Sequence, residues 1–518
     1  MRAFLEAQAA RSQAAPASGP RAQVTAAAAS APSLADVLAN VRKALQYERV
    51  SKIPAITIRG ISTEGGIPWD SYSTFDNHGR FHGGASSVLG TTAYGFDGTT
   101  CWSTNLPHAT RRLVLSDRDS MLLNNWLESG YWLTGVVDVT LVAGLTTEKE
   151  IVLELSLKTG RYRMQLTIDR AKWLPTRLRA DVGGIVETWT YSDYRNSPAG
   201  PNPYFTSHET AGVTDTFKVT KIEIAKPDLN ALRFKPSQPT NARFDDKLPG
   251  ALQTAREPVT GCLLVRPRIN GKDVGWFVFD TGASELVIDR AVADQLGLET
   301  LGKAPIFGVA GTEQTRFRTS KSFQLGRLSR TNNFYAETDM KAEFPSAQER
   351  LAGVVGFPVL EAAVVEFQLA PPAVSLHDAK QYKLQKGEWQ DLTLLGGLAC
   401  FRARFEGNRE GLFLLDTGSV RTVAFNEFAV RRLDLLKGRR LTFGTSVGVG
   451  GRTPIQNGRI DWFEIAGHRF EKPMASFFQH SNLGGLSEDT LGHVGQKLLG
   501  AFRVVLNCQE EKIAFQEK

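Results

Sequence analysis

An internal duplication in the second half of the chain constrains the fold more than any other sequence feature. The triplet Asp280-Thr281-Gly282 follows the apolar run 276–279, and the triplet Asp416-Thr417-Gly418 follows the apolar run 412–415. A single triplet of this kind is a common accident. Two triplets in matching contexts indicate two copies of one unit, and such repeats decide the architecture before any local prediction.

Further landmarks follow each triplet in the same order. A glycine-rich tip comes first, formed by Gly308, Val309, Ala310 and Gly311 in one half and by Gly448, Val449, Gly450 and Gly451 in the other. An apolar element with two glycines comes next, at 353–360 and at 492–499. The spacing predicts two repeats, at 257–387 and 388–518, built mostly of short strands. Each is expected to carry a helical stretch after its triplet, at 289–298 and 426–435.

The paired aspartates point to acid–base chemistry. Hydrolysis of an amide by water needs one group to take a proton and another to give one. Two carboxyls about 3 Å apart cannot both ionise easily, so the pair shares a proton and supplies both functions. Glycine permits the tight turn at the strand end, and Thr281 and Thr417 can bond across to the opposite loop. We therefore expect Asp280 and Asp416 to be catalytic, with Thr281, Gly282, Thr417 and Gly418 supporting their loops.

Both repeats resemble the retropepsin-like aspartic proteases. The motif of that family, Asp-Thr/Ser-Gly-Ala/Ser followed by an apolar-Gly element, matches residues 280–283 and 416–419, and Val354-Val355-Gly356 matches the second element. His493 departs from the pattern because the family places an apolar residue there. The resemblance implies one bilobal protease unit in a single chain, with Asp280 and Asp416 sharing one site. It also implies that the tips at 308–311 and 448–451 act as flaps over the substrate.

Two functions follow from this resemblance. The first is an aspartic endopeptidase that hydrolyses peptide bonds of a peptide or protein substrate without a cofactor or metal. The second is a non-catalytic envelope protein that binds lipid or peptide, in which the lobes are a pseudo-protease platform. Pairing of an extended substrate with the flaps would follow the strand-addition mode of peptide recognition.

The first half of the chain is expected to form an antiparallel sheet and a helix. Ser33 and Asp36 resemble a capping box, with apolar residues on one face up to Leu45. The runs 153–157 and 162–168 alternate between apolar and polar residues and are joined by Lys158-Thr159-Gly160, which predicts a hairpin. The tryptophans Trp126, Trp132, Trp173 and Trp189 are expected to pack in the core or at its edge. Prolines from Pro227 to Pro249 predict a linker over 227–256.

Residues 33–226 resemble, more faintly, the half-barrel of the LolA/LolB-like lipoprotein carriers. The residues that carry this resemblance include 94–98, 168–170, 174–177 and 191–194. The resemblance implies a concave apolar face that shelters a lipid or acyl ligand. The alternative is a β-domain whose apolar face is filled by its own helix, since fold does not dictate function. The expected fold class is therefore mainly β, with a half-barrel followed by two retropepsin-like lobes.

Composition excludes several other classes. The net charge is +7 over 518 residues and the basic residues are scattered, so no nucleic-acid surface is expected. The chain has no long apolar run, so an integral membrane protein is not expected either. His78 and His82 have the spacing of a metal-binding helix, but Gly79, Gly83 and Gly84 predict a loop instead. The four cysteines lack metal-ligand spacing, and a disulfide such as Cys262–Cys400 stays open.

The N-terminal residues 1–32 are rich in Ala, Ser, Gln and Pro. Glu6, Gln8 and Arg11 interrupt any apolar segment, so the stretch does not qualify as a signal peptide. We interpret it as a disordered leader, with a start further upstream as the alternative. Both family resemblances point to a bacterial periplasmic or secreted location.

Overall fold

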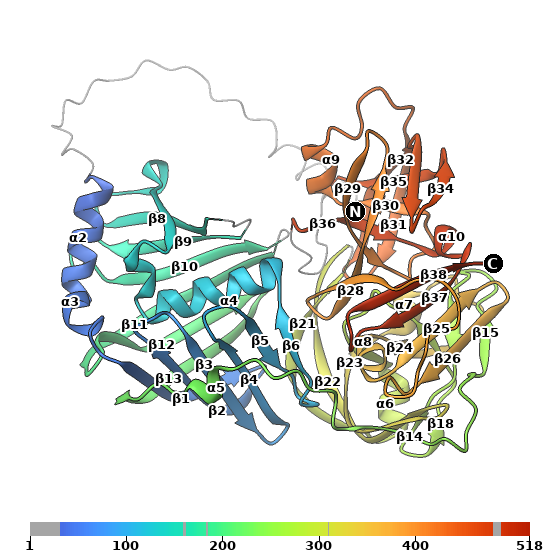
Figure 1. Cartoon of the computed structure of the whole chain (residues 1–518), viewed down its shortest axis with the longest axis horizontal. Coiled ribbons are helices and arrows are strands. Elements are labelled where there is room, and N and C mark those ends of the chain that lie inside the picture. The colour runs from blue at the N-terminus through green and yellow to red at the C-terminus, as the bar shows by residue number, and fades with distance from the viewer. Residues whose placement is uncertain (1–31, 159–161, 183–184, 309, 480–487) are drawn as a thin grey trace, which may run out of the picture.

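The chain folds as a curled β-sheet domain beside two β lobes (Figure 1). The computed structural model describes residues 32–158, 162–182, 185–308, 310–479 and 488–518. The mainly β fold class is thereby confirmed. The expected leader lies almost entirely outside the described residues, as do Thr159 and Gly160 of the hairpin turn and Val309 of the first tip.

The N-terminal sheet is a single antiparallel run of 13 strands in the order β6-β5-β4-β3-β2-β1-β13-β12-β11-β10-β9-β8-β7. Strands that follow each other in sequence pair with each other, except β6 and β7, which form the two opposite edges of the sheet. The pairing of β1 with β13 brings the two ends of the domain together. The strands are β1 (Ala55–Glu64), β2 (Ile67–Asp76), β3 (Phe81–Ser87), β4 (Gly90–Phe96), β5 (Cys101–Thr104), β6 (Thr110–Leu113), β7 (Val137–Leu141), β8 (Glu150–Leu157), β9 (Arg163–Asp169), β10 (Pro175–Val182), β11 (Ile185–Ser197), β12 (Gly200–Thr210) and β13 (Val213–Ala225). The predicted hairpin is β8 and β9, with Leu155 opposite Met164.

Helices cover the inner face of this sheet (Figure 1). Helix α2 (Leu34–Ala44) begins at Ser33, whose side chain accepts a hydrogen bond from the N–H of Asp36 as predicted, and it buries Val37 and Val41. The short helix α3 (Tyr47–Val50) follows it. Helix α4 (Leu115–Glu128) buries Leu122, Leu123 and Trp126 against the same core. Trp126 and Trp132 are buried and Trp173 and Trp189 are partly buried against this core, so all four tryptophans pack as expected.

The first lobe is an 11-stranded sheet with the main path β15-β16-β19-β24-β20-β23-β22-β17-β18. Its strands are β14 (Ala242–Phe244), β15 (Thr254–Arg256), β16 (Leu263–Val265), β17 (Arg268–Ile269), β18 (Lys272–Asp273), β19 (Trp276–Phe279), β20 (Leu286–Asp289), β21 (Glu299–Gly308), β22 (Gly311–Leu325), β23 (Leu328–Thr338) and β24 (Leu351–Val355). The helices are α6 (Arg290–Gln295), α7 (Met340–Glu343) and α8 (Phe357–Ala362). Helix α6 is shorter than the stretch predicted from the sequence, because the chain turns at Gly297, whose φ is +65°.

The second lobe repeats this plan. Its strands are β27 (Gln390–Leu395), β28 (Leu398–Phe405), β29 (Arg409–Leu415), β30 (Val423–Phe425), β31 (Thr442–Gly448), β32 (Gly451–Arg459), β33 (Trp462–Ile465), β34 (His468–Glu471), β35 (Met474–Phe478), β36 (Thr490–Val494), β37 (Phe502–Asn507) and β38 (Lys512–Glu517). The helices are α9 (Glu427–Arg432) and α10 (Gln496–Leu499). As in the first lobe, the helix after the aspartate is shorter than predicted.

The two lobes share a sheet. Strands β25 (Val364–Leu369) and β26 (Pro372–His377) pair with each other, and β25 also pairs with β37 of the second lobe. One apolar core runs through both lobes and includes Phe279, Phe367, Phe401 and Phe515. The lobes are therefore one packed body, and any relative motion between them would have to break this core.

The region expected as a linker adds strands to the first lobe. It carries helix α5 (Leu229–Leu232), and it also carries β14, which pairs with β23, and β15, which pairs with β16. The prolines lie between these elements, where strand pairing does not require the backbone N–H that proline lacks.

The half-barrel domain is bonded to both lobes. The N–H of Ser116 donates to Asp489 at 2.8 Å, and the N–H of Gly396 donates to Asp117 at 2.9 Å. Arg111 forms an ion pair with Glu361 at 3.3 Å. All four cysteines are buried and free, so the disulfide left open above is not formed. Among the helices of the described residues, none is long and apolar enough to cross a membrane.

Candidate active site

Each aspartate lies where a strand of its lobe ends beside a parallel neighbour. Strand β19 runs parallel to β24, and the N–H of Asp280 donates to the carbonyl of Val355 at 3.0 Å. In the second lobe β29 runs parallel to β36, and the N–H of Asp416 donates to Val494 at 3.1 Å. Strands β24 and β36 also pair with β20 and β30 on their other side. The same three-strand arrangement therefore holds both carboxyls.

The two threonines join the loops of the two lobes. The N–H of Thr281 donates to the hydroxyl oxygen of Thr417 at 3.0 Å, and the N–H of Thr417 donates to the hydroxyl oxygen of Thr281 at 3.1 Å. Each hydroxyl in turn donates to a carbonyl of the opposite strand, at 2.6 Å to Leu415 and at 2.8 Å to Phe279. Both threonines are completely buried. These four bonds place the two aspartates side by side.

Backbone amides from both lobes hold the carboxyl of Asp280. The Oδ1 atom accepts hydrogen bonds from Gly282 at 2.8 Å and from Gly418 of the other lobe at 3.1 Å. A Cβ atom on Gly418 would lie 2.4 Å from Oδ2 of Asp280, and one on Gly282 would lie 2.9 Å from Oδ1 of Asp416. Only glycine leaves room for such an approach. The structure thus brings together all six residues predicted for the centre of the site.

The environment raises the pKa of both carboxyls. For Asp280 the larger cause is burial, and the neighbouring charge of Asp416 adds to it. For Asp416 burial also raises the pKa, against hydrogen bonds from Ser419 and Gly418 that lower it. Because a proton stabilises two carboxyls held close together, one proton is expected to be shared between them.

The two predicted tips belong to hairpins that meet each other. Strands β21 and β22 form the first hairpin, and β31 and β32 form the second. The N–H of Ala310 donates to the carbonyl of Val449 at 3.2 Å. A Cβ atom on Gly450 would lie 2.3 Å from the backbone nitrogen of Gly311. Gly308, Ala310 and Gly311 of the first tip therefore lie against Val449 and Gly450 of the second. That these hairpins close over a substrate stays a prediction.

Sequence reasoning did not assign three polar residues beside Asp416. Ser419 donates its N–H to Oδ1 of Asp416 at 2.9 Å. His493 lies with Nε2 3.8 Å from Oδ2 of Asp416. The Gln496 amide donates to the carbonyl of Thr417 at 2.7 Å. The available signal was the difference between the two repeats, because the matching positions in the first repeat are Ala283, Val354 and Phe357.

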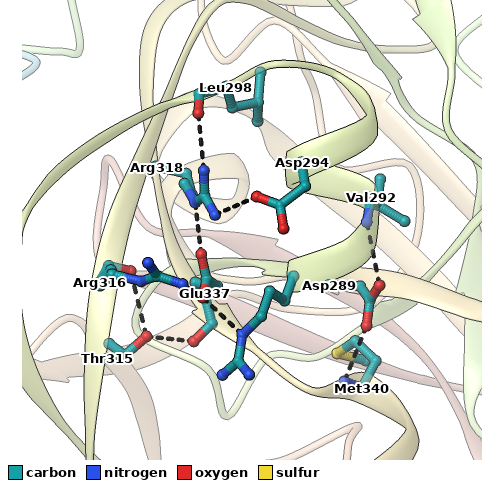
Figure 2. A network of polar contacts seen from close by, with 10 residues as sticks. Asp289, Val292, Asp294, Leu298, Thr315, Arg316, Arg318, Glu337 and Met340 are labelled. Carbon is teal, nitrogen blue, oxygen red and sulfur yellow. Dashed lines mark hydrogen bonds and ion pairs between the residues drawn. The ribbon is translucent and has the colours of Figure 1, made fainter.

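A network of charges fixes the base of the first hairpin (Figure 2). Glu337 on β23 is buried and pairs with Arg318 at 2.5 Å, with Arg316 at 2.8 Å and with Arg290 at 2.9 Å. Arg318 also bonds Asp294 of α6. Burial would raise the pKa of Glu337, but the three guanidinium groups outweigh that effect and lower it. Glu337 pairs with Ile288 of β20, and in the second lobe Phe477 pairs with Phe425 of β30, so Phe477 takes the place of Glu337 there. This network therefore belongs to the first lobe.

The described residues contain no group of three or more His, Cys, Asp and Glu side chains placed to hold a metal ion. His82, one of the two histidines with helical metal-ligand spacing, lies on strand β3 with its ring against Tyr72.

Comparison with known proteins places these observations in a family context. The family model described as aspartyl protease matches residues 265–359 and 401–501. A comparison with curated protein sequences found no match.

Three solved structures are among those similar to a part of this chain. A DUF1329 family protein from Desulfovibrio piger is 11% identical, covering 36% of this chain and 92% of its own, with a TM-score of 0.27. A LolA superfamily protein from Nitrosomonas europaea is 13% identical, covering 37% and 97%, with a TM-score of 0.28. A retropepsin-like aspartic protease from Rickettsia conorii is 18% identical, covering 23% and 90%, with a TM-score of 0.18.

The two matched segments contain Asp280 and Asp416 and the elements that hold them. The aspartyl protease family model therefore matches the C-terminal region of this chain twice, once in each of its two lobes.

Proposed function

We propose that this chain is an aspartic endopeptidase with one active site, formed by Asp280 and Asp416. The observation that carries the proposal is the shared environment of the two carboxyls. They come from different lobes, are held by amides and threonines that cross between the lobes, and both have a raised pKa. A dyad that retains one proton near neutral pH can act as base and acid at once.

The chemistry needs no covalent intermediate. The ionised carboxyl takes a proton from a water molecule while the water oxygen forms a bond to the carbonyl carbon of the scissile amide. The protonated carboxyl gives its proton to the carbonyl oxygen, which yields a neutral gem-diol. In the second step one diol hydroxyl returns its proton to a carboxylate, the other carboxyl protonates the amide nitrogen, and the C–N bond breaks. Both carboxyls then regain their starting protonation with one proton between them.

The substrate in this proposal is an extended peptide segment. The two hairpins present backbone groups of Gly308, Ala310 and Gly311 and of residues 448–451. Strand-like pairing with such edges gives affinity that depends little on sequence. The side chains around the hairpins would then select among substrates.

A peptide-library cleavage assay from about pH 3 to about pH 8 tests the proposal, since that range spans the titration of a coupled carboxyl pair. The wild type is compared with Asp280→Asn and Asp416→Asn. Both substitutions keep the side-chain shape and remove one titrating group. Cleavage by the wild type alone is the expected result. Residual activity above about a tenth of wild type in either variant would contradict a shared dyad.

A second candidate function concerns the half-barrel. A hollow between α3, α4 and β1 is lined by Val50, Ile53, Ile56, Ile58 and Phe75 among others. Glu128, the last residue of α4, also lines the hollow, and desolvation raises the pKa of its carboxyl to about 7. We propose that the hollow binds a lipid or acyl chain. Native mass spectrometry of the purified chain should show a co-purifying lipid mass, and a spectrum of the polypeptide alone would count against it.

A periplasmic or secreted location is part of the same proposal. Fractionation of cells that express the full chain tests it, with recovery in the cytoplasmic fraction as the contradicting result.

A further inference from the structure

The two sides of the dyad differ at one pair of positions. Val354 on β24 lies opposite Val278, two residues before Asp280, and His493 on β36 lies opposite Leu414, two residues before Asp416. The residue after each Asp-Thr-Gly triplet differs too, being Ala283 in one lobe and Ser419 in the other. Two apolar residues in the first lobe are thus replaced by two polar residues in the second.

The polar pair in the second lobe is in contact. The hydroxyl of Ser419 and Nε2 of His493 are 3.2 Å apart, within hydrogen-bond distance. The same Nε2 atom lies 3.8 Å from Oδ2 of Asp416. His493 is only 4% exposed, so its ring belongs to the floor of the site. Asp280 has no such polar neighbour at the equivalent place, because Val354 and Ala283 occupy it.

The remaining surroundings of His493 are mostly apolar. Phe478 from β35 lies with its ring 6.1 Å from the imidazole, and Ala424 from β30 lies opposite it in the sheet. The charged groups that face it are Asp416 and Arg421. Burial lowers the pKa of His493 to about 4, and the positive charge of Arg421 adds to that effect. The ring is therefore neutral over most of the range in which a carboxyl pair titrates.

We infer that His493 and Ser419 form a positioning pair that makes the two carboxyls inequivalent. The pair favours Asp416 as the ionised partner and leaves the shared proton on Asp280. The physical reason is that polar groups beside a carboxylate stabilise its charged form, whereas an apolar wall stabilises the protonated form. Resting on the function proposed above, this assigns the step that removes a proton from water to Asp416 and the step that protonates the carbonyl oxygen to Asp280.

The pH dependence of cleavage tests the assignment. His493→Val and Ser419→Ala each install the residue type that the first lobe has at the matching position. Each is expected to shift the midpoint of the acidic limb of the kcat/KM profile to a pH about one unit higher, because the ionised carboxyl loses a polar neighbour. The double variant should shift little further than the larger single variant, since the two side chains act as a unit. Val88→Ala, at an 89% exposed position in the turn between β3 and β4, is the control and should leave the limb in place. An unchanged limb in His493→Val overturns the inference.

A second measurement does not depend on cleavage. In the Asp280→Asn background only Asp416 of the dyad titrates, so infrared detection of its protonated carboxyl gives its own midpoint without coupling to a second acid. Adding His493→Val should raise that midpoint by about one pH unit. An unchanged or lowered midpoint refutes the positioning pair. If the wild type cleaves no peptide but the midpoint still rises, the proposed function fails while the inequivalence of the carboxyls stands.

Discussion

Thr281 and Thr417 exchange hydrogen bonds across the two lobes, each N–H donating to the hydroxyl oxygen of the other, at 3.0 and 3.1 Å. Neither side chain touches solvent. The bonds tie together two loops that are far apart in sequence, and the spacing of the carboxyls depends on them.

Replacing Thr281 by Val should therefore destabilise the protein. Valine has nearly the same shape but leaves the N–H of Thr417 and the carbonyl of Leu415 buried without a partner. A buried group left unpaired costs about 1–3 kcal/mol, so a loss of about 2–4 kcal/mol is expected in denaturant unfolding. Thr281→Ser keeps the hydroxyl and is the control. Equal stability of the Val and Ser variants would show that the crossed bonds contribute little.

The raised pKa of the dyad predicts a stability that falls with rising pH. Burial first, and the charge of Asp416 second, raise the folded-state pKa of Asp280 above its unfolded value. Protonated Asp280 therefore contributes fully to the free energy of unfolding at pH values below the unfolded-state pKa. This contribution is lost as the pH rises through the folded-state pKa. In Asp280→Asn the side chain does not ionise, so this position no longer destabilises the protein at high pH.

The variant should be more stable than wild type by at least about 1 kcal/mol at pH 8, and no more stable at pH 4, since one pKa unit corresponds to about 1.4 kcal/mol. Thermal unfolding at both pH values measures the difference. Asp70→Asn, at an exposed position of β2, is the control. A stability difference that is the same at both pH values would contradict a raised carboxyl pKa.

The Glu337 network predicts a large effect from one substitution in the first lobe. Glu337→Gln leaves the side chain of Arg318, which is only 7% exposed, without its closest carboxylate. Breaking a buried ion pair on one side costs about 3–5 kcal/mol. Glu471→Gln breaks a pair with Arg469 in which the Glu471 side chain is 67% exposed, and it should cost less than about 1 kcal/mol. Chemical denaturation of both variants compares them. Similar small losses would show that the network contributes little to stability.

The parts of the fold that depend on local pattern could be predicted from the sequence. The hairpin of β8 and β9, the capped helix from Ser33 and the six central residues of the site all follow from periodicity, capping chemistry or repetition. Pairing between distant edges could not be predicted in this way. Nothing near β25 shows that it joins β37 of the other lobe, and the prolines of 227–256 conceal two short strands. Glu337 and Phe477 occupy matching places with opposite chemistry, so the repeat itself gave no hint of the charge network.

Hydrogen bonds join the half-barrel to the first of the two hairpins. The carbonyl of Gly65, in the turn between β1 and β2, accepts a hydrogen bond from the N–H of Lys303 at 2.8 Å. The carbonyl of Gly212, in the turn between β12 and β13, accepts one from the Gln314 side chain at 3.2 Å. The first hairpin is thus tied to a neighbouring domain, whereas among the described residues no hydrogen bond joins the half-barrel to β31 or β32 of the second hairpin. We expect slower amide exchange in the first hairpin than in the second.

A pair of adjacent glycines allows a controlled test of this restraint. A Cβ atom on Gly65 would lie 2.2 Å from the carbonyl oxygen of Lys303, whereas one on Gly66 would meet nothing within 4 Å. Both residues have positive φ, so alanine introduces backbone strain at either position, but only Gly65→Ala disrupts the contact. Hydrogen exchange by mass spectrometry should show amides of β21 exchanging about fivefold faster in Gly65→Ala, as expected for the loss of a bond worth ~1 kcal/mol. Exchange there should be unchanged in Gly66→Ala. Equal acceleration in both variants would mean that strain in the turn, and not the contact with Lys303, governs the hairpin.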